Sequence, residues 1–132
     1  MISLHTPLTR ETKHIFRVET MALMKPGGIL IHVSRGASVD TKALIKALKT
    51  GHLAGVGLDV YEEEEAAFFL DLSGGVLRDD ELARLLIFPN VLIASHQAFR
   101  TAEAMTGIAR TTVANICALA GQAPFVEASL AA

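Results

Sequence analysis

The stretch Ile29–Ser34 (ILIHVS) decides the fold class of this chain. It is almost entirely apolar and rich in β-branched side chains, without the polar alternation of a strand that has one face in water. A continuous run of this kind is typical of a parallel strand covered on both faces. Gly27-Gly28 precedes it and Arg35-Gly36 follows it, so we expect a turn at each end.

Strand-like and helix-like segments alternate on either side of this run. We expect further strands at Ile2–Leu4, Ala54–Val60 and Asn90–Ser95. Helical patterns occur at Val18–Met24, in a segment that Asp40 caps and that runs to Lys49, at Asp80–Leu86, and in a long final segment from the cap Thr101 to Gly121. This alternation predicts an α/β fold with a parallel sheet, and we expect helices on both of its faces.

The composition excludes several classes of protein. The 132 residues are 51% hydrophobic and 20% charged, with a net charge of -2, which excludes a disordered chain and gives no electrostatic basis for binding nucleic acid. No apolar run reaches the ~18 residues of a membrane span, and the first residues do not resemble a signal peptide, so we expect no membrane partner. The one cysteine, Cys117, cannot form an internal disulfide, which favours a cytoplasmic location.

Polar and charged side chains follow each expected strand. The carboxyl ends of parallel strands lie at the same edge of a sheet, where ligands bind. The residues expected at this edge are His5–Pro7, Ser34–Gly36, Asp59, Glu62–Glu65 and His96. A guanidinium, several carboxylates and an imidazole are thereby predicted to converge.

Each of these residues has a structural as well as a functional interpretation. Arg35 can hydrogen-bond a nearby carbonyl, or clamp a substrate carboxylate through its planar guanidinium. His96 can be structural, or a general acid and base, because histidine titrates closest to neutral pH. The run Glu62–Glu65 can be a solvated charge run, or can supply a carboxylate that favours a protonated His96. Asp59 can simply end a strand, or contact a ribose hydroxyl or the nicotinamide of a cofactor.

Metal-dependent and covalent hydrolytic chemistry are not favoured. The histidines do not have the spacing of a metal motif, and with a single cysteine we expect no metal site. We interpret His52 as a residue at a helix C-terminus that complements the helix dipole, and His14 and His32 as structural or exposed. No serine lies in a Gly-x-Ser-x-Gly motif.

Several segments of the sequence resemble the NAD-dependent D-2-hydroxyacid dehydrogenases, most closely the D-lactate dehydrogenase branch. They occur in the family's order from about residue 2 to residue 120, at Ser3–Thr9, Met24–Gly27, Val33–Gly36, Gly57–Glu62, Phe88–Leu92 and Ser95–Phe99. The stretch Glu65–Arg84 is similar to the loop of D-lactate dehydrogenases rather than that of the glycerate or formate enzymes. The resemblance implies a partial Rossmann-like, doubly wound parallel sheet, the second half of a dinucleotide-binding domain, with a long C-terminal helix.

The resemblance also implies roles for individual residues. Arg35 would hold the substrate carboxylate, His96 would exchange a proton with the substrate oxygen, and Glu64 would pair with His96, with Glu63 and Glu65 as alternatives. The residues that would line the nicotinamide-ribose half of NAD are Thr6, Pro7, Thr12, Val33, Ser34 and Asp59. The substrate would be a small 2-oxo or 2-hydroxy acid such as pyruvate or D-lactate, with hydroxypyruvate or glyoxylate as the alternative.

Two features of that family do not occur in the sequence. No segment matches Gly-x-Gly-x-x-Gly, and the acidic residue that would bind the adenosine ribose is missing. We therefore interpret residues 1–132 as a single partial NAD-binding domain, without the N-terminal half and the substrate domain, and expect little or no activity from the chain alone. The alternative is a non-catalytic module. In either case the open edge of the first strand predicts a homo-oligomer or a complex with another chain.

Overall fold

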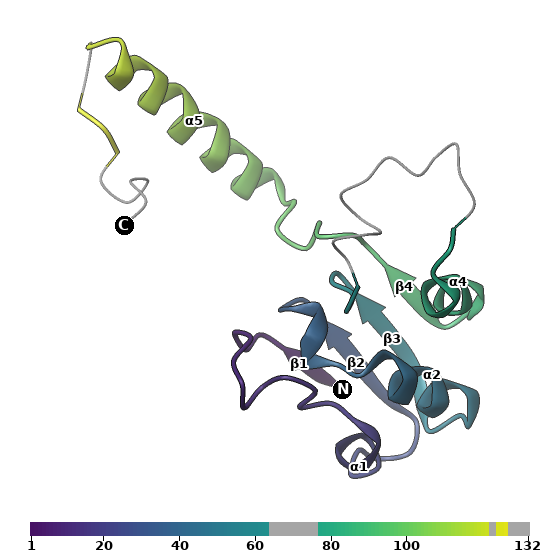
Figure 1. Ribbon diagram of the computed structural model, residues 1–132. Coiled ribbons are helices and arrows are strands. Elements are labelled where there is room, and N and C mark those ends of the chain that lie inside the picture. Colours follow the sequence, from purple (N-terminus) through teal and green to yellow (C-terminus); the bar gives the residue numbers. More distant parts are fainter. Residues whose placement is uncertain (64–76, 122–123, 127–132) are drawn as a thin grey trace. The chain divides into compact units, whose positions relative to one another are not determined.

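The computed structural model describes residues 1–63, 77–121 and 124–126 (Figure 1). The chain divides into two compact units, Met1–Gln97 and Ala98–Ala132. The first unit holds a sheet and its helices, and the second holds one long helix.

The first unit is built on a four-stranded parallel sheet. Its strands are β1 (Ile2–Leu4), β2 (Gly28–His32), β3 (Leu53–Leu58) and β4 (Val91–Ile93), and they lie side by side in the order β1-β2-β3-β4 (Figure 1). The expected α/β fold of the Rossmann type is thereby confirmed. Strands β2, β3 and β4 end two residues earlier than the sequence predicts, because Ser34, Val60 and Ser95 already belong to the loops beyond the sheet.

One helix of this unit begins at a side-chain cap that the sequence predicts. Helix α2 (Thr41–Lys49) starts after Asp40, whose carboxylate accepts a hydrogen bond from the amide of Ala43. The short helices are α1 (Val18–Met21), the 3-10 turn η1 (Gly36–Ser38) and α4 (Asp80–Ile87). Helix α1 ends three residues earlier than expected, because Ala22–Met24 turn toward the Pro26-Gly27 stop before β2.

These helices pack on one face of the sheet, whereas the sequence analysis expects helices on both. One hydrophobic core joins strand residues such as Leu30 and Val56 to Leu44 of α2 and Leu85 of α4. The reason is the strand order: right-handed crossovers that always advance in the same direction place every connecting helix on the same side. Alternate strand residues face the other side, where Leu92 is 71% exposed.

The second unit contains α5 (Ala102–Leu119). As predicted, Thr101 caps it, with its hydroxyl accepting a hydrogen bond from the amide of Ala104. The apolar side chains exposed along this helix are Met105, Ile108, Val113, Ile116 and Leu119. None of the helices in the described residues is long and apolar enough to cross a membrane.

Tyr61 connects the end of β3 to α4. The side chain is 3% exposed, and its hydroxyl donates a hydrogen bond of 2.8 Å to the Asp79 carboxylate. The other oxygen of Asp79 caps α4 by accepting from the amides of Glu81 and Leu82. Burial, followed by the hydrogen bond and the negative charge of Asp79, raises the pKa of Tyr61 well above its usual value.

The close approach of two loops at the carboxyl edge requires glycine at position 36. A Cβ atom added to Gly36 would lie 1.8 Å from the carbonyl oxygen of Tyr61 and 2.8 Å from the amide nitrogen of Glu62. Both are backbone atoms, so neither can move aside without displacing the end of β3. The turn after β2 and the loop after β3 are therefore packed backbone against backbone.

We predict that Tyr61 stays protonated in the folded chain at alkaline pH. The raised pKa favours the neutral phenol, so this contribution to stability is complete below the unfolded pKa of about 10 and is lost as pH rises above it. Tyr61 is the only tyrosine and the chain has no tryptophan, so phenolate absorbance reports this residue alone. Native chain should show phenolate only as it unfolds; titration of folded chain at the pKa of chain unfolded in urea would contradict the prediction.

We also predict that Gly36→Ala lowers the free energy of unfolding of the first unit by about 3 kcal/mol, because the added methyl group overlaps backbone. Urea unfolding followed by Tyr61 fluorescence measures it. Gly57→Ala is the matched control, since its Cβ would meet only the end of the Ile31 side chain, at 3.0 Å, and that side chain can shift. Equal stability losses for the two variants would disprove the argument.

Candidate functional site

The register of the sheet brings the ends of its four strands to one level. Leu4 pairs with His32, His32 with Leu58, and Leu58 with Ile93. The chain then leaves all four strands at the same edge, which we call the carboxyl rim: the residues His5–Leu8, Val33–Gly36, Asp59–Glu62 and Ala94–Gln97. The predicted convergence of polar residues at this edge therefore has a structural basis.

A cleft of about 550 Å³ lies at the rim beyond β1 and β2. It is lined by His5, Thr6, Pro7, Leu8, Val33, Ser34 and Arg35. Five residues predicted for the site, Thr6, Pro7, Val33, Ser34 and Arg35, thus share one cleft. The Thr6 hydroxyl is buried and has no hydrogen-bond partner among the described residues. Buried polar atoms are normally satisfied, so this hydroxyl is suited to a polar ligand in the cleft.

Arg35 stands at the mouth of this cleft, where the 3-10 turn η1 begins. Its Nη1 donates a hydrogen bond of 3.0 Å to the carbonyl of Ser34, and its amide donates to the Ser34 hydroxyl at 2.6 Å. The structural interpretation of Arg35, a bond to a nearby carbonyl, is therefore realised. That contact uses one of five N–H donors of the guanidinium, and the exposed side chain keeps others for an anionic ligand.

Asp59 is buried and holds the segment that carries His96. Its backbone carbonyl accepts from the amide of His96 at 2.6 Å, and its carboxylate accepts from the amide of Gln97 at 2.6 Å. Ser95 and His96 have φ angles of 50° and 58°, in the left-handed region that side chains rarely adopt, at a cost of order 1–3 kcal/mol each. Asp59 thus fixes an unusual backbone, and the Nε2 atom of His96 is buried.

Arg35 and His96 come from strands that have one strand between them. Because neighbouring strands lie about 4.8 Å apart, β2 and β4 are separated by roughly 10 Å. Arg35 lines the cleft beyond β1 and β2, and His96 lies on the same rim beyond β4 without lining that cleft.

The structure does not bring every predicted residue into the cleft: Asp59 and His96 lie on the carboxyl rim but do not line the cleft. Thr12 lies in the loop after β1, and its hydroxyl donates to the carbonyl of Pro7 at 2.7 Å, so it supports the cleft residue Pro7 without lining the cleft. Glu64 and its alternative Glu65 lie outside the described residues. Glu63 is described and exposed.

Sequence reasoning missed the role of Glu62 and His14. The Glu62 carboxylate contacts the Nε2 atom of His14 at 2.5 Å and accepts hydrogen bonds from Thr41 at the start of α2. Neither the acidic run nor the position of His14 signals this contact, because 48 residues separate the two side chains. Among the described residues, no group of three or more side chains could hold a metal ion.

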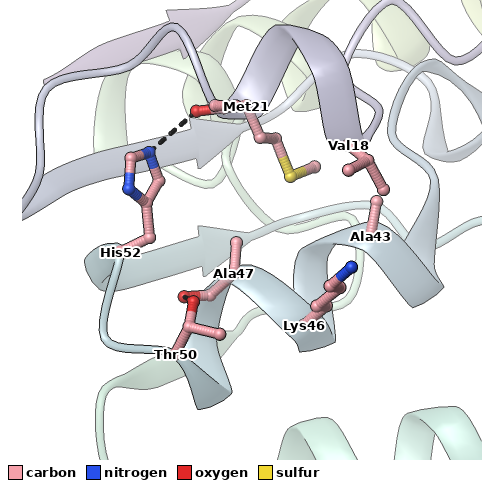
Figure 2. Close-up of a pocket in the computed structure, with 8 residues that line it drawn as sticks. Val18, Met21, Ala43, Lys46, Ala47, Thr50 and His52 are labelled. Carbon is pink, nitrogen blue, oxygen red and sulfur yellow. Dashed lines mark hydrogen bonds between the residues drawn. The ribbon is translucent and has the colours of Figure 1, made fainter.

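A second cleft, of about 190 Å³, lies between α1 and α2, and Figure 2 shows its lining. Apolar side chains such as Met21 and Ala47 form its walls. His52 lies just beyond the C-terminal end of α2, where the sequence predicts it, and its Nε2 atom also donates to the carbonyl of Met21 in α1 at 2.9 Å. This cleft lies near the amino ends of β2 and β3, away from the carboxyl rim. Few of its lining residues have side chains suited to catalysis.

Comparison with known proteins identifies the sheet and its rim. Residues 1–98 match the family model of the D-isomer specific 2-hydroxyacid dehydrogenase NAD binding domain. That match includes β1 to β4 and all the described rim residues.

Individual relatives extend the match beyond the sheet. The 2-hydroxyacid dehydrogenase A of Aspergillus oryzae is 53% identical over 116 residues, which are 88% of this chain and 33% of that protein. The D-lactate dehydrogenase of Escherichia coli is 46% identical over 116 residues, 88% of this chain and 35% of that protein. The structure of the pyruvate reductase of Chlamydomonas reinhardtii has a TM-score of 0.79 at 38% identity, and the match covers 93% of this chain and 38% of that one.

The chain spans about a third of the length of the curated relatives it matches. The part that it shares with them includes the four strand ends and the cleft described above. With the family model covering residues 1–98, this chain belongs to the D-isomer-specific 2-hydroxyacid dehydrogenase family and carries sequence of its NAD-binding domain.

Proposed function

We propose that this chain forms the nicotinamide and substrate side of an NAD-dependent D-2-hydroxyacid dehydrogenase that interconverts a small 2-oxo acid and its 2-hydroxy acid. The observation that carries the proposal is the cleft beyond β1 and β2, where Arg35 and four of the predicted NAD-binding residues lie together, on the rim that also holds His96. Fold alone does not determine function, whereas these side chains have the chemistry that such a reaction needs.

The cleft fits the nicotinamide-ribose half of the cofactor. Val33 and Pro7 give it apolar walls for the ring, and the buried Thr6 hydroxyl and Ser34 offer polar atoms for the ribose or carboxamide. Asp59, next along the rim, accepts a hydrogen bond from the amide of Gln97, and the proposal includes it as a further cofactor contact. The bound reduced nicotinamide would supply the hydride.

The proposed residues handle charge and protons around that transfer. Arg35 would bind the substrate carboxylate and orient the carbonyl. Protonated His96 would donate its proton to the carbonyl oxygen, which becomes the hydroxyl, and the neutral imidazole would regain a proton from solvent. In the reverse direction His96 would remove that proton. Glu64, five residues beyond Asp59, would favour the protonated imidazole.

We propose pyruvate and D-lactate as the substrate pair. Support comes from relatives whose names include D-lactate dehydrogenase and pyruvate reductase. The single cysteine of the chain, Cys117, supports a reducing, cytoplasmic setting. Because no Gly-x-Gly-x-x-Gly motif occurs in these residues, we infer that the chain alone binds NAD weakly and turns over little substrate.

A second candidate function, self-association, is favoured by the uncovered face of the sheet. In the first unit, Leu92 is 71% exposed and Ile29 is 41% exposed on the side opposite the core. Strand β1 is also at the edge of the sheet, with its hydrogen-bonding groups paired on one side only. This candidate is compatible with the dehydrogenase, because the face and the rim are different surfaces.

A chimeric enzyme tests the dehydrogenase directly. This chain replaces the matching segment of the Escherichia coli D-lactate dehydrogenase, and we expect pyruvate-dependent oxidation of NADH to be retained. In the chimera His96→Gln should lower kcat by about 10²- to 10⁴-fold, since the proton donor is lost. Arg35→Lys should lower kcat/KM by roughly 10- to 100-fold, mainly through KM, because the bidentate contact is lost.

The controls of this test are substitutions of the same type elsewhere. Arg84→Lys, on the exposed side of α4, should leave kcat/KM unchanged. Glu63→Gln, Glu64→Gln and Glu65→Gln, made one at a time, should single out Glu64 as the variant with reduced activity. An active chimera in which Arg35→Lys behaves like Arg84→Lys would refute the proposed site.

Sedimentation equilibrium tests the second candidate. We expect the chain to self-associate at micromolar concentration and Leu92→Lys to shift it toward monomer, since a charge would be buried in the contact. Leu86→Lys provides the control, because Leu86 is a similarly exposed leucine, at 60%, on α4. A monomeric unmodified chain, or equal effects of the two variants, would rule out association through this face.

A further inference from the structure

Three chain segments that carry proposed site residues meet beside the carboxyl rim. The first is the loop His5–Arg17, the second is the turn Arg35–Ser38, and the third is the exit from β3 at Asp59–Glu63. Backbone hydrogen bonds join the first two: the amide of His14 donates to Ala37 at 2.9 Å, and the amide of Phe16 donates to Ser38 at 3.1 Å. These bonds hold the loop with Thr6, Pro7 and Thr12 against the turn that begins at Arg35.

Glu62 connects the third segment to the first one and to the start of helix α2, three residues beyond the second segment. Its Oε1 atom contacts His14 Nε2 at 2.5 Å, and its Oε2 atom accepts from the amide and the hydroxyl of Thr41 at 3.2 Å and 3.1 Å. Both oxygens are thus used, one toward the loop and the other toward the first residue of α2.

The backbone conformation of His14 and the positive end of the α2 dipole are both consistent with the contacts of Glu62. His14 has a φ of 50°, in the left-handed region, a conformation that persists where surrounding contacts determine it. Thr41 is the first residue of α2, and a carboxylate there faces the positive end of the helix dipole. Glu62 also follows Tyr61, whose backbone is packed against Gly36, so its position is fixed from both sides.

We propose that Glu62 is a positioning residue: through His14 and Thr41 it holds the loop after β1, the Arg35 turn and the start of the acidic run in one fixed arrangement. That these segments form a cofactor and substrate site rests on the proposed function. The arrangement itself is a property of the described residues and is testable without any activity. Glu62 acts through its neighbours and is assigned no contact with substrate.

Amide hydrogen exchange on the full chain tests this role. In Glu62→Gln the exchange of the His14 and Phe16 amides should accelerate about tenfold, because a bond from a charged group is lost near them. The amides of Asp59 and Ala94, which donate to the strand carbonyls of His32 and Leu58 and do not contact Glu62 or His14 in these bonds, should keep their rates. His14→Asn should give the same local pattern, since asparagine tolerates the left-handed backbone but lacks the ring, and Glu62→Gln in that background should add little.

Glu19→Gln is the matched control, because Glu19 has an exposed ion pair with Arg17 in the same unit and should change none of these rates. Uniform acceleration at all four amides, or no acceleration at any, would overturn the positioning role.

A fluorescence titration with NADH separates this proposal from the proposed function. Because the chain alone is inferred to bind NAD weakly, this titration uses the chimera. Weaker NADH binding by the Glu62→Gln chimera than by the unmodified chimera, together with the local exchange pattern of the chain, supports both. No NADH binding by the unmodified chimera counts against the cofactor site, while the exchange rates still decide the role of Glu62.

Discussion

The level register of four parallel strands is the constraint on which the rest of this structure depends. Leu4, His32, Leu58 and Ile93 form one row across the sheet, so the next few residues of each strand leave at the same edge. Which side chains meet at this edge then depends only on which residues follow each strand in the sequence. A shift of one residue in any pairing would send the residues of that strand to the opposite face and would separate the cleft residues of β1 from those of β2.

Much of the fold follows from the sequence because its signals are local. Apolar runs predict the strands, and Asp40 and Thr101 predict the starts of α2 and α5, since an N-cap acts within three residues. The faces covered by helices could not be predicted in this way, because they depend on the spatial order of the strands. That order is a long-range property, and a steady advance from β1 to β4 places the described helices of the first unit on one face.

The residues of the candidate site also separate into those that local sequence predicts and those whose contacts depend on how loops fold back. The predicted residues Thr6, Pro7, Val33, Ser34 and Arg35 line one cleft because each follows a strand closely. Thr12 and Glu62 sit farther from a strand end, and their contacts are set by how loops fold back. The acidic run looked like a solvated segment, yet its first member is bonded to His14 and Thr41. A contact between residues so far apart in the chain leaves no periodic pattern in the sequence from which it could be predicted.

In the proposed function, the groups that would orient a bound cofactor and substrate are distinct from the motif that gives a dinucleotide its binding affinity. Dinucleotides gain much of their binding energy where phosphates meet a glycine-rich turn at a helix N-terminus, and no such motif occurs in these 132 residues. In the proposed function, the rim would instead provide groups that orient the ligands: a guanidinium at the cleft, a buried hydroxyl, and an imidazole on a backbone held by Asp59. Such a role requires rigid placement, and the residues with positive φ angles, Ser95, His96 and His14, lie in segments that hydrogen bonds fix beside the rim.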